Sequence, residues 1–349
     1  MTANTSRAST YDALLSTTLD KYRPTLTDNV FNGRPLHRWL NEKGRRRMLD
    51  GGATIVEPLI YGAGEAAFYG ENDVLDITPQ QGISSATFDW KDIYATIYIS
   101  GQEFRKNSGE AQILNLLDAK TMQAEETLKD ALAQAEYADA PADDNTILGL
   151  GALINDAAGD LAASNTGADA IGNIDTQGKN EFWQSVVLDG SDAASGEEVR
   201  KLIRSGRNAA SDSGSDRCDA AFTDQTTFEA VEDSYVHQVR YEDVDSANAG
   251  FENVMVSKMP LFWDFECPDG TVFGINSKYL QIVGHEDAWM KQTPFSVNPV
   301  DSTHSSNGAT GGVRDGRYSI ITCMLALTTR NRRRHFRING IDIEAANTP

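Results

Sequence analysis

Residues whose types and spacing could perform chemistry are few in this chain of 349 residues. Residues 62–67 (Gly-Ala-Gly-Glu-Ala-Ala) match the dinucleotide-binding pattern G-x-G-x-x-A, in which glycines let the backbone approach a pyrophosphate. That pattern needs a strand before it and a helix after it, but Gly70 follows closely and strand-like sequence resumes. The segment favours a flexible glycine loop, and a dinucleotide-binding enzyme is the weaker alternative.

Other possible active-site residues lack their partners. Residues 212–214 (Asp-Ser-Gly) have no orienting base nearby, and the acidic segment 243–250 has Ala247 where a calcium ligand is required. The five histidines and three cysteines show no zinc-binding spacing. We therefore expect no catalytic, cofactor-binding or metal site, and no enzyme.

Charge is abundant and unevenly distributed. The chain has 31 Lys and Arg against 51 Asp and Glu, a net charge of −20, which argues against a protein that coats nucleic acid with a basic surface. Residues 1–47 nevertheless carry a net +5 and residues 314–337 a net +6. These clusters are either solvated loops or contacts to a polyanion or to an acidic neighbouring surface. The candidate contact residues are Arg38, Arg45, Arg46, Arg47, Arg332, Arg333 and Arg334.

Neither a membrane span nor a secretion signal is expected. The most apolar run, residues 318–327, is half the length of about 20 residues that a spanning helix needs. The first 22 residues lack an apolar core of the signal-peptide type. The three cysteines are far apart, which is typical of a reducing compartment.

The first third of the chain predicts extended structure. Residues 1–52 are broken by Pro and Gly and read as an arm, with a short helix possible at 11–22. Residues 53–101 predict a long antiparallel hairpin that ends in an alternating segment. In that segment Ile93, Ala95, Ile97 and Ile99 face one side, and Tyr94, Thr96 and Tyr98 the other.

A long helix is expected next, at residues 107–137. Asn107 can cap it, with Glu110 as the capping-box partner. Apolar and small residues recur at steps of three and four: Leu114, Leu117, Thr121, Ala124, Leu128, Ala131 and Ala135. At 1.5 Å per residue the rod would be about 42 Å long.

The remaining chain predicts a mixed domain and then returning strands. Helices are expected at 197–208 and at 224–235, the second capped by Thr223 or within a capping box from Thr226 to Glu229. Residues 262, 263 and 265, all aromatic, are expected in the core. Residues 317–328 predict a central strand, because they are apolar on both faces, and residues 330–338 a second, basic strand.

This order resembles the major capsid protein of tailed double-stranded DNA phages, which has the Hong Kong ninety-seven-like fold. The matching stretches are residues 44–56, 56–100, 108–117, 149–154, 316–325 and 331–336. The resemblance implies an α+β capsid fold with an N-terminal arm (1–52), an extension loop (53–101) and a peripheral domain with a spine helix (102–145). It also implies an inserted axial α/β domain (146–300) and a return to the peripheral domain (301–349).

The resemblance also implies the function. Such proteins form hexamers and pentamers that close into an icosahedral shell around the genome, assembled in the host cytoplasm and found in the virion. The expected partners are other copies, a portal, separate scaffolding and decoration proteins, and packaged double-stranded DNA, without a membrane. An encapsulin-type compartment shell is the alternative.

Candidate contact residues follow from this reading. The exposed apolar parts of the arm and hairpin suggest Trp39, Phe68, Trp90, Tyr94 and Tyr98 as contacts between subunits. Some members of the family bond a lysine of the extension loop to an asparagine of a neighbour. By that resemblance, Lys91 could bond to Asn331 or Asn339.

Overall fold

The computed structural model describes residues 34–62, 66–71, 82–106, 110–139, 145–155, 170–175, 181–211, 216–235, 253–297 and 316–343. The possible helix at 11–22, the segments 212–214 and 243–250, and residues 63–65 of the glycine pattern lie outside them. The chain divides into two compact units, each assembled from distant segments. Residues 92–132 and 287–323 belong to the first, and residues 34–91, 133–286 and 324–349 to the second.

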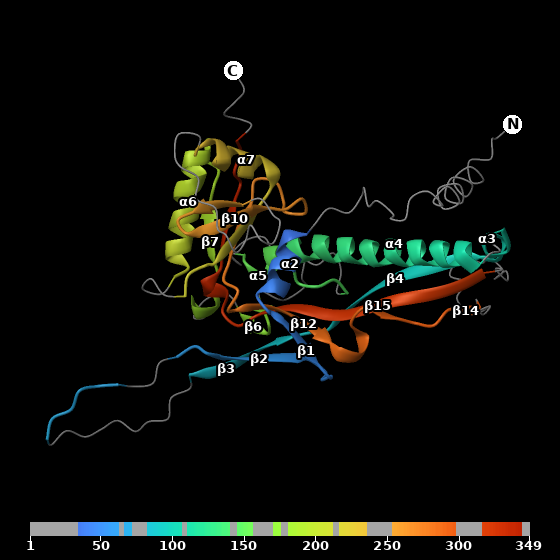
Figure 1. The fold of residues 1–349 in the computed structure, drawn as a ribbon. Coiled ribbons are helices and arrows are strands. Elements are labelled where there is room, and N and C mark those ends of the chain that lie inside the picture. Colours follow the sequence, from blue (N-terminus) through green and yellow to red (C-terminus); the bar gives the residue numbers. More distant parts are fainter. Residues whose placement is uncertain are drawn as a thin grey trace, which may run out of the picture. The chain divides into compact units, whose positions relative to one another are not determined.

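The first unit combines a small sheet with a long helix. Strand β15 (Gly316–Thr329) begins here and pairs with β4 (Lys91–Ser100), β13 (Lys291–Gln292) and β14 (Ser296–Val297). Helix α3 (Gly101–Lys106) precedes α4 (Glu110–Tyr137), whose first part runs beside β4 (Figure 1). The prediction that β15 is central is confirmed, since it has neighbours on both sides.

The predicted long helix is a single helix of 28 residues. Its buried positions agree with the expected pattern at Ala124 and Leu128, but Ala131 is exposed and Leu132 is buried. The buried face therefore advances by four residues at this point. Alanine and leucine alternate closely here, so the sequence pattern alone favoured the wrong step.

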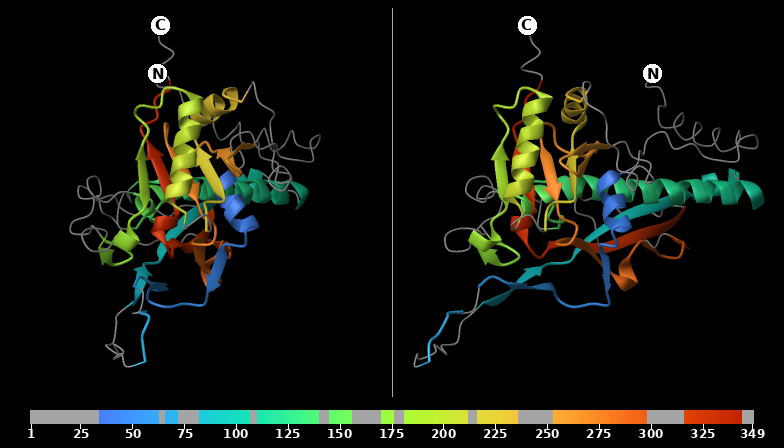
Figure 2. Two further views of the ribbon diagram at one scale, coloured as in Figure 1. Left: turned by 90° about the vertical axis from the view of Figure 1, so that its left-hand side faces the viewer. Right: turned by 60° about the vertical axis from the view of Figure 1, so that its left-hand side comes forward.

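The second unit contains a six-stranded mixed sheet in the order β7-β16-β11-β8-β10-β9. Helices α6 (Gly196–Ala209) and α7 (Gln225–Asp233) contact each other and pack on its strands (Figure 2). The strands are β7 (Val186–Asp189), β8 (Ala220–Thr223), β9 (Asn253–Val256), β10 (Met259–Trp263), β11 (Val272–Ile275) and β16 (Phe336–Asn339).

Phe336 lies at the centre of this packing. A Cβ atom on Gly206 of α6 would lie 2.6 Å from its ring, and one on Gly274 of β11 would lie 1.9 Å from it. Both positions therefore require glycine for close approach. The predicted helix at 224–235 is α7, but its cap is Asp224, which accepts from the Thr227 N–H at 3.1 Å. Thr223 cannot cap it, because it belongs to strand β8.

Two further strands of this unit extend the sheet that contains β15. The last residues of β15 pair with β12 (Leu280–His285), and β12 pairs in parallel with β1 (Arg46–Leu49). A two-stranded sheet joins β2 (Ile55–Ile60) to β3 (Ile83–Phe88), and a smaller one joins β5 (Ala170–Ile171) to β6 (Ile174–Asp175). The short helices are α2 (Pro35–Glu42), α5 (Leu150–Leu153), η3 (Glu181–Trp183), η4 (Glu286–Ala288) and η5 (Arg332–Arg334).

Three sequence predictions need correction. The hairpin of residues 53–101 is shorter than expected, because β2 pairs with β3 while β4 pairs with β15. Residues 330–338 do not form one strand, since η5 interrupts them before β16. Residues 66–70 are not helical, so the helix that a dinucleotide pattern requires does not follow Gly62.

The strands also cross the expected boundary at residue 300. β16 comes from the C-terminal segment but pairs with β7 and β11 of the predicted inserted domain. Conversely, β12 comes from that inserted segment but pairs with β1 and β15. Residue numbers could not reveal this exchange, because strand pairing joins segments that are distant in sequence.

His335 fixes the short connection between β15 and β16. Its Nδ1 accepts from the Asn276 N–H at 3.2 Å, so Nε2 carries the proton and donates to Thr329 Oγ1 at 3.3 Å. Complete burial, helped by the charge of Arg332, lowers the pKa of His335 from 6.5 to about 3. The ring is therefore neutral when the protein is folded at neutral pH.

This pKa predicts a loss of stability in acid. Between pH 6.5 and about 3 the unfolded state binds the His335 proton and the folded state does not, so stability falls as the pH falls. At about 1.4 kcal/mol per pH unit, moving from pH 7 to pH 5 should cost the unassembled subunit about 2 kcal/mol through this residue. Urea unfolding at both pH values, compared with His335→Asn, isolates the effect. Equal pH dependence of the two proteins would show that folding does not lower the pKa of His335.

Candidate interaction surfaces

The β2–β3 hairpin presents one face to its own chain and the other to solvent. Ile55 and Leu59 of β2 are buried, whereas Val56 and Ile60 are exposed. Ile83 of β3 lies directly opposite Ile60, and the two are 75% and 81% exposed. Aliphatic side chains that meet across a ladder on an uncovered face form an apolar contact surface.

Glu57 attaches the inner face of this hairpin to the rest of its unit. Its side chain has no exposed surface. It accepts hydrogen bonds from Arg47 Nη1 at 3.2 Å, from Gln281 Nε2 at 2.6 Å and from Arg330 Nε at 2.6 Å. These donors belong to β1, β12 and the residue after β15, so one carboxylate joins the hairpin to three segments.

Strand β3 has a second attachment, at the turn between β5 and β6. The Thr87 N–H donates to the Gly172 carbonyl at 2.9 Å. Gly172 has a φ of 65°, and a Cβ there would lie 2.8 Å from the Cβ of Ala86, so the contact requires glycine. Tyr61 stacks on Phe182 with ring centroids 5.0 Å apart. The root of the hairpin is thus held by its own chain at both strands.

Beyond this root, the described part of the loop is exposed. The predicted contact residue Phe68 is fully exposed, and its neighbour Tyr69 is 70% exposed. Exposed aromatic rings of this kind are typical anchors in protein interfaces. Their contact with another subunit stays a prediction.

Strand β4 carries the predicted candidates Tyr94 and Tyr98, which are 71% and 40% exposed. The strand alternates as expected, with Ala95, Ile97 and Ile99 buried. Beside Tyr98 in the sheet, a Cβ on Gly316 would lie 2.5 Å from the tyrosine hydroxyl. The Tyr98 ring therefore packs on its own chain, while Tyr94 remains an exposed contact candidate.

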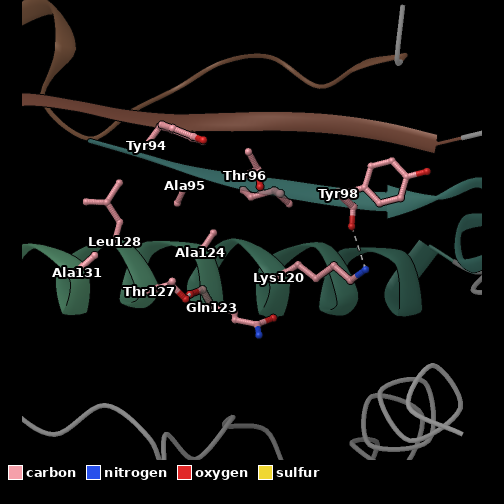
Figure 3. A pocket seen from close by; sticks show the side chains of 11 residues that line it. Tyr94, Ala95, Thr96, Tyr98, Lys120, Gln123, Ala124, Thr127, Leu128 and Ala131 are labelled. Atoms are coloured by element: carbon pink, nitrogen blue, oxygen red, sulfur yellow. Dashed lines mark hydrogen bonds between the residues drawn. The ribbon is translucent and has the colours of Figure 1, made fainter. Parts of the chain in front are cut away.

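Between β4 and α4 lies an open groove of about 510 Å³ (Figure 3). At one end Lys120 donates to the Tyr98 carbonyl at 3.1 Å and to the Glu103 carboxylate at 2.9 Å. Burial opposes ionisation of Glu103, but hydrogen bonds from Lys120 and Ser100 lower its pKa overall. The groove between β4 and α4 is lined by Tyr94, Ala95, Thr96, Ile97, Tyr98, Lys120, Gln123, Ala124, Thr127, Leu128 and Ala131.

Trp39 is not available for a contact between subunits, and that prediction is wrong. Only 6% of the residue is exposed, and its ring meets Phe222 edge-on at 5.6 Å. The arm looked too broken to have a core of its own, but α2 packs on the core of the second unit. Trp90 is half-buried and donates to the Gly52 carbonyl at 2.9 Å, so its outward contact stays a prediction.

Polar contacts fasten α2 in place. Asp264 accepts from the Leu36 N–H at 3.4 Å and from the Tyr137 hydroxyl at 2.9 Å. Burial raises the pKa of Asp264, although these hydrogen bonds partly offset the shift. His37 Nδ1 lies 2.9 Å from the buried carboxylate of Glu136. No sequence pattern indicates these partners, because they are distant along the chain.

The arginine candidates of the first basic cluster lie in different surroundings. Arg38 pairs with Glu42 at 2.9 Å on the surface of α2, and Arg47 binds Glu57. Arg46 is exposed, while Arg45 is half-buried. Arg46 therefore presents its side chain to solvent, and its contact to a neighbour or genome stays a prediction.

Arg332 is buried, and its predicted outward contact is wrong. Its guanidinium donates to the carbonyls of Leu153 at 2.7 Å, Trp183 at 2.9 Å and Asn155 at 2.9 Å. The run of three arginines is divided by η5, which turns the first one inward and leaves Arg333 exposed. Arg334 is half-buried, with its Nη1 3.5 Å from the Ala210 carbonyl.

The crosslink candidates occupy three different settings. Lys91 begins strand β4 and is half-buried. Asn331 precedes η5, and Asn339 ends β16 opposite Asp189. No contact with a second subunit is described for them, so the covalent bond stays a prediction.

The sequence analysis does not predict the exposure of three apolar residues. Phe265, expected in the core, is 83% exposed in the turn after β10, whereas Phe262 is buried. Ile60 and Ile83 were not singled out. A signal existed for Ile60, because the other outward residues of β2, Val56 and Pro58, are also apolar.

The described side chains offer few groups that could act as nucleophiles or metal ligands. Burial raises the pKa of Cys218 to about 12 and that of Cys267 well above its ordinary value, which keeps both thiols protonated. Within the described ranges, no three side chains of His, Cys, Asp or Glu gather as metal ligands do. Among the helices that the structure describes, none has the length and apolar character to span a membrane.

Comparison with known proteins places the fold. No family model and no curated protein matches the sequence. The capsid asymmetric unit of cyanophage A-1(L) aligns with a TM-score of 0.60 and 17% identity, over 90% of this chain and 95% of that one. The capsid of an empty GTA particle aligns with a TM-score of 0.53 and 11% identity, over 91% and 100%. The chain has the phage capsid fold.

The predicted fold class is therefore confirmed. The capsid fold is also shared by the SrpI encapsulin of Synechococcus elongatus, which aligns with a TM-score of 0.52 and 7% identity over 95% of this chain and 97% of that one. At such identities the likeness concerns the fold alone. The residues that define a contact must come from this chain's own surfaces.

Trp39 provides a first test of the inward and outward assignments. Trp39→Ala should lower the free energy of unfolding of the unassembled subunit by about 3–5 kcal/mol, because it empties a core position. Phe68→Ala, at an exposed ring, should change it by no more than about 0.5 kcal/mol. Both values can be measured by urea unfolding. A Trp39→Ala subunit of normal stability would return Trp39 to the list of outward contacts.

Arg332 and Arg333 form a matched pair for a second test. Arg332→Met removes the donor to the buried Leu153 and Trp183 carbonyls and one of the two donors to the Asn155 carbonyl, and should destabilise the subunit by at least about 3 kcal/mol. Arg333→Met removes the same charge from an exposed position and should be nearly neutral. Similar melting temperatures for the two variants would contradict the burial of Arg332.

Proposed function

We propose that this protein is a major capsid protein whose copies assemble as hexamers and pentamers into an icosahedral shell around a double-stranded DNA genome. The outer face of the β2–β3 hairpin is the observation that carries the proposal. Ile60 and Ile83 are held in a fixed place by the buried root of the hairpin, yet they remain in water. In the capsid fold, a neighbouring copy is the partner that would cover them.

The free energy gained when a neighbouring copy covers the hairpin face is repeated at every subunit of a hexamer or pentamer. Burying an aliphatic side chain such as Ile60 or Ile83 fully is worth about 1.5–3 kcal/mol. Each copy offers one hairpin and receives another, so a small gain per residue accumulates over the closed assembly. Phe68 and Tyr69, farther along the loop, are exposed as well. The protein needs no catalytic step for this role, and we infer none.

The proposed partners follow from the same role. A portal, scaffolding protein and decoration proteins would join the shell, and packaged DNA would meet exposed arginines such as Arg46 and Arg333 without sequence preference. The protein would assemble in the host cytoplasm and reside in the virion. A covalent bond between Lys91 and Asn331 or Asn339 of a neighbour belongs to this proposal as well.

An encapsulin-type shell is the second candidate, because an encapsulin shares the fold. The phage reading is preferred, since the cyanophage capsid aligns with a TM-score of 0.60 and the encapsulin with 0.52. Particles purified from their natural source separate the two. Nuclease-protected DNA supports the phage shell, whereas a protein cargo supports the compartment.

Assembly itself can be tested at Ile60. Ile60→Asp places a charge on the outer face and should abolish closed particles in negative-stain electron microscopy, at unchanged subunit stability. Ile60→Val is the matched control, because it keeps an apolar, β-branched side chain and should assemble normally. The experiment is done with scaffolding protein present if wild-type subunits require it.

Two results would contradict the proposal. One is a wild-type protein that remains a small oligomer under all conditions, scaffold included. The other is normal assembly of Ile60→Asp, which would remove the hairpin face from the contact and leave the shell without its proposed anchor.

A further inference from the structure

We propose that Glu57 and its three donors form a joint that fixes the direction of the β2–β3 hairpin before subunits meet. The inference concerns one chain alone, and only its consequence for assembly rests on the proposed function. The joint is defined as Glu57, Arg47, Gln281 and Arg330. It lies at the root of the hairpin, where β2 passes the sheet that contains β1, β12 and the end of β15.

The position of Glu57 in its strand is the first argument. The inward side of β2 consists of Ile55, Glu57 and Leu59, so a carboxylate occupies a place where the alternation calls for an apolar side chain. A hydrophobic residue could fill that place from many angles. A buried carboxylate tolerates only orientations in which its donors reach it, because an unpaired buried charge costs several kcal/mol. Glu57 therefore gives the attachment a direction.

The geometry of the donors is the second argument. Gln281 and Arg47 approach Oε1, while Arg330 approaches Oε2. Contacts on both oxygens restrain rotation of the carboxylate as well as its position. The donors come from three segments that are already fixed in one sheet through the pairings of β12 with β1 and β15. Rotation of the hairpin would break at least one of these bonds.

The second attachment, at Gly172, would remain if the joint were lost. The Thr87–Gly172 hydrogen bond and the Tyr61–Phe182 stack do not involve Glu57. Without the joint, the hairpin therefore keeps one contact in β3 and one directly after β2, and we expect it to pivot about them. The joint then acts as a positioning device, distinct from the contacts that hold the hairpin to the fold.

Hydrogen–deuterium exchange of the unassembled subunit tests this role. In Glu57→Gln, which keeps the size of the side chain but removes its charge, amides of Ile55–Ile60 and Ile83–Phe88 should exchange at least tenfold faster than in the wild type. Amides of β8 and β11 should be unchanged. Glu42→Gln is the matched control, because it removes the same charge from an exposed pair on α2.

A second variant guards against misfolding. Arg47→Gln removes the longest of the three contacts, and the Arg47 side chain is 43% exposed, so this variant should fold normally and show a smaller increase in the same amides. Unchanged exchange in the hairpin of both variants would overturn the proposal. So would an increase of equal size throughout the second unit, which would mean that Glu57 stabilises the fold as a whole.

The consequence for assembly is read separately. Glu57→Gln subunits should form particles with a broader range of diameters than Glu42→Gln subunits, because hairpins that pivot meet their neighbours at variable angles. Faster hairpin exchange with uniform particles would keep the joint but remove its influence on assembly. Absence of particles from the wild type as well would count against the proposed function and leave the joint itself intact.

Discussion

A charged side chain is buried at a tolerable cost only where partners pair with it and hydrogen-bond it, and this constraint shapes the second unit at two points. Glu57 is completed by donors from three segments, and Arg332 by three backbone carbonyls. The first arrangement fixes the root of the hairpin. The second holds the turn between β15 and β16 against the end of α5 and against η3.

The hairpin is consequently ordered at its root and incomplete on its outer face. Its inner side chains are buried by its own chain, whereas Ile60 and Ile83 have no cover from the described residues. An isolated two-stranded ribbon would be marginal in water, so the buried root is needed for the outer face to exist as a defined surface. This combination of a fixed root and an uncovered apolar face is what a subunit of a repeating shell requires, because every copy must offer the same surface at the same angle.

The sequence predicted the parts of this structure that depend on local pattern. The spine helix, the alternation of β4 and the central position of β15 follow from periodicity within one segment. Pairing partners and burial of single residues depend on distant segments, and there the predictions failed. Trp39 was assigned outward because the arm could build no core alone, yet Phe222 supplies that core. Arg332 was assigned outward as part of a charge run, yet carbonyls from residues 153–183 receive it.

Net charge limits which surfaces can bring copies together. Each chain carries −20, so two copies repel one another at a distance. At physiological salt this repulsion is screened beyond about 8 Å, and contact then depends on the groups that actually touch. The hairpin face around Ile60 and Ile83 carries no charge, because Val56, Pro58 and Ser85 complete it. It can therefore be buried without removing an ion from water, whereas a contact through the acidic surface would need a cation or hydrogen-bond donors for every carboxylate that it covers. An uncharged patch on a fixed root is thus the part of this acidic chain best suited to bind another copy.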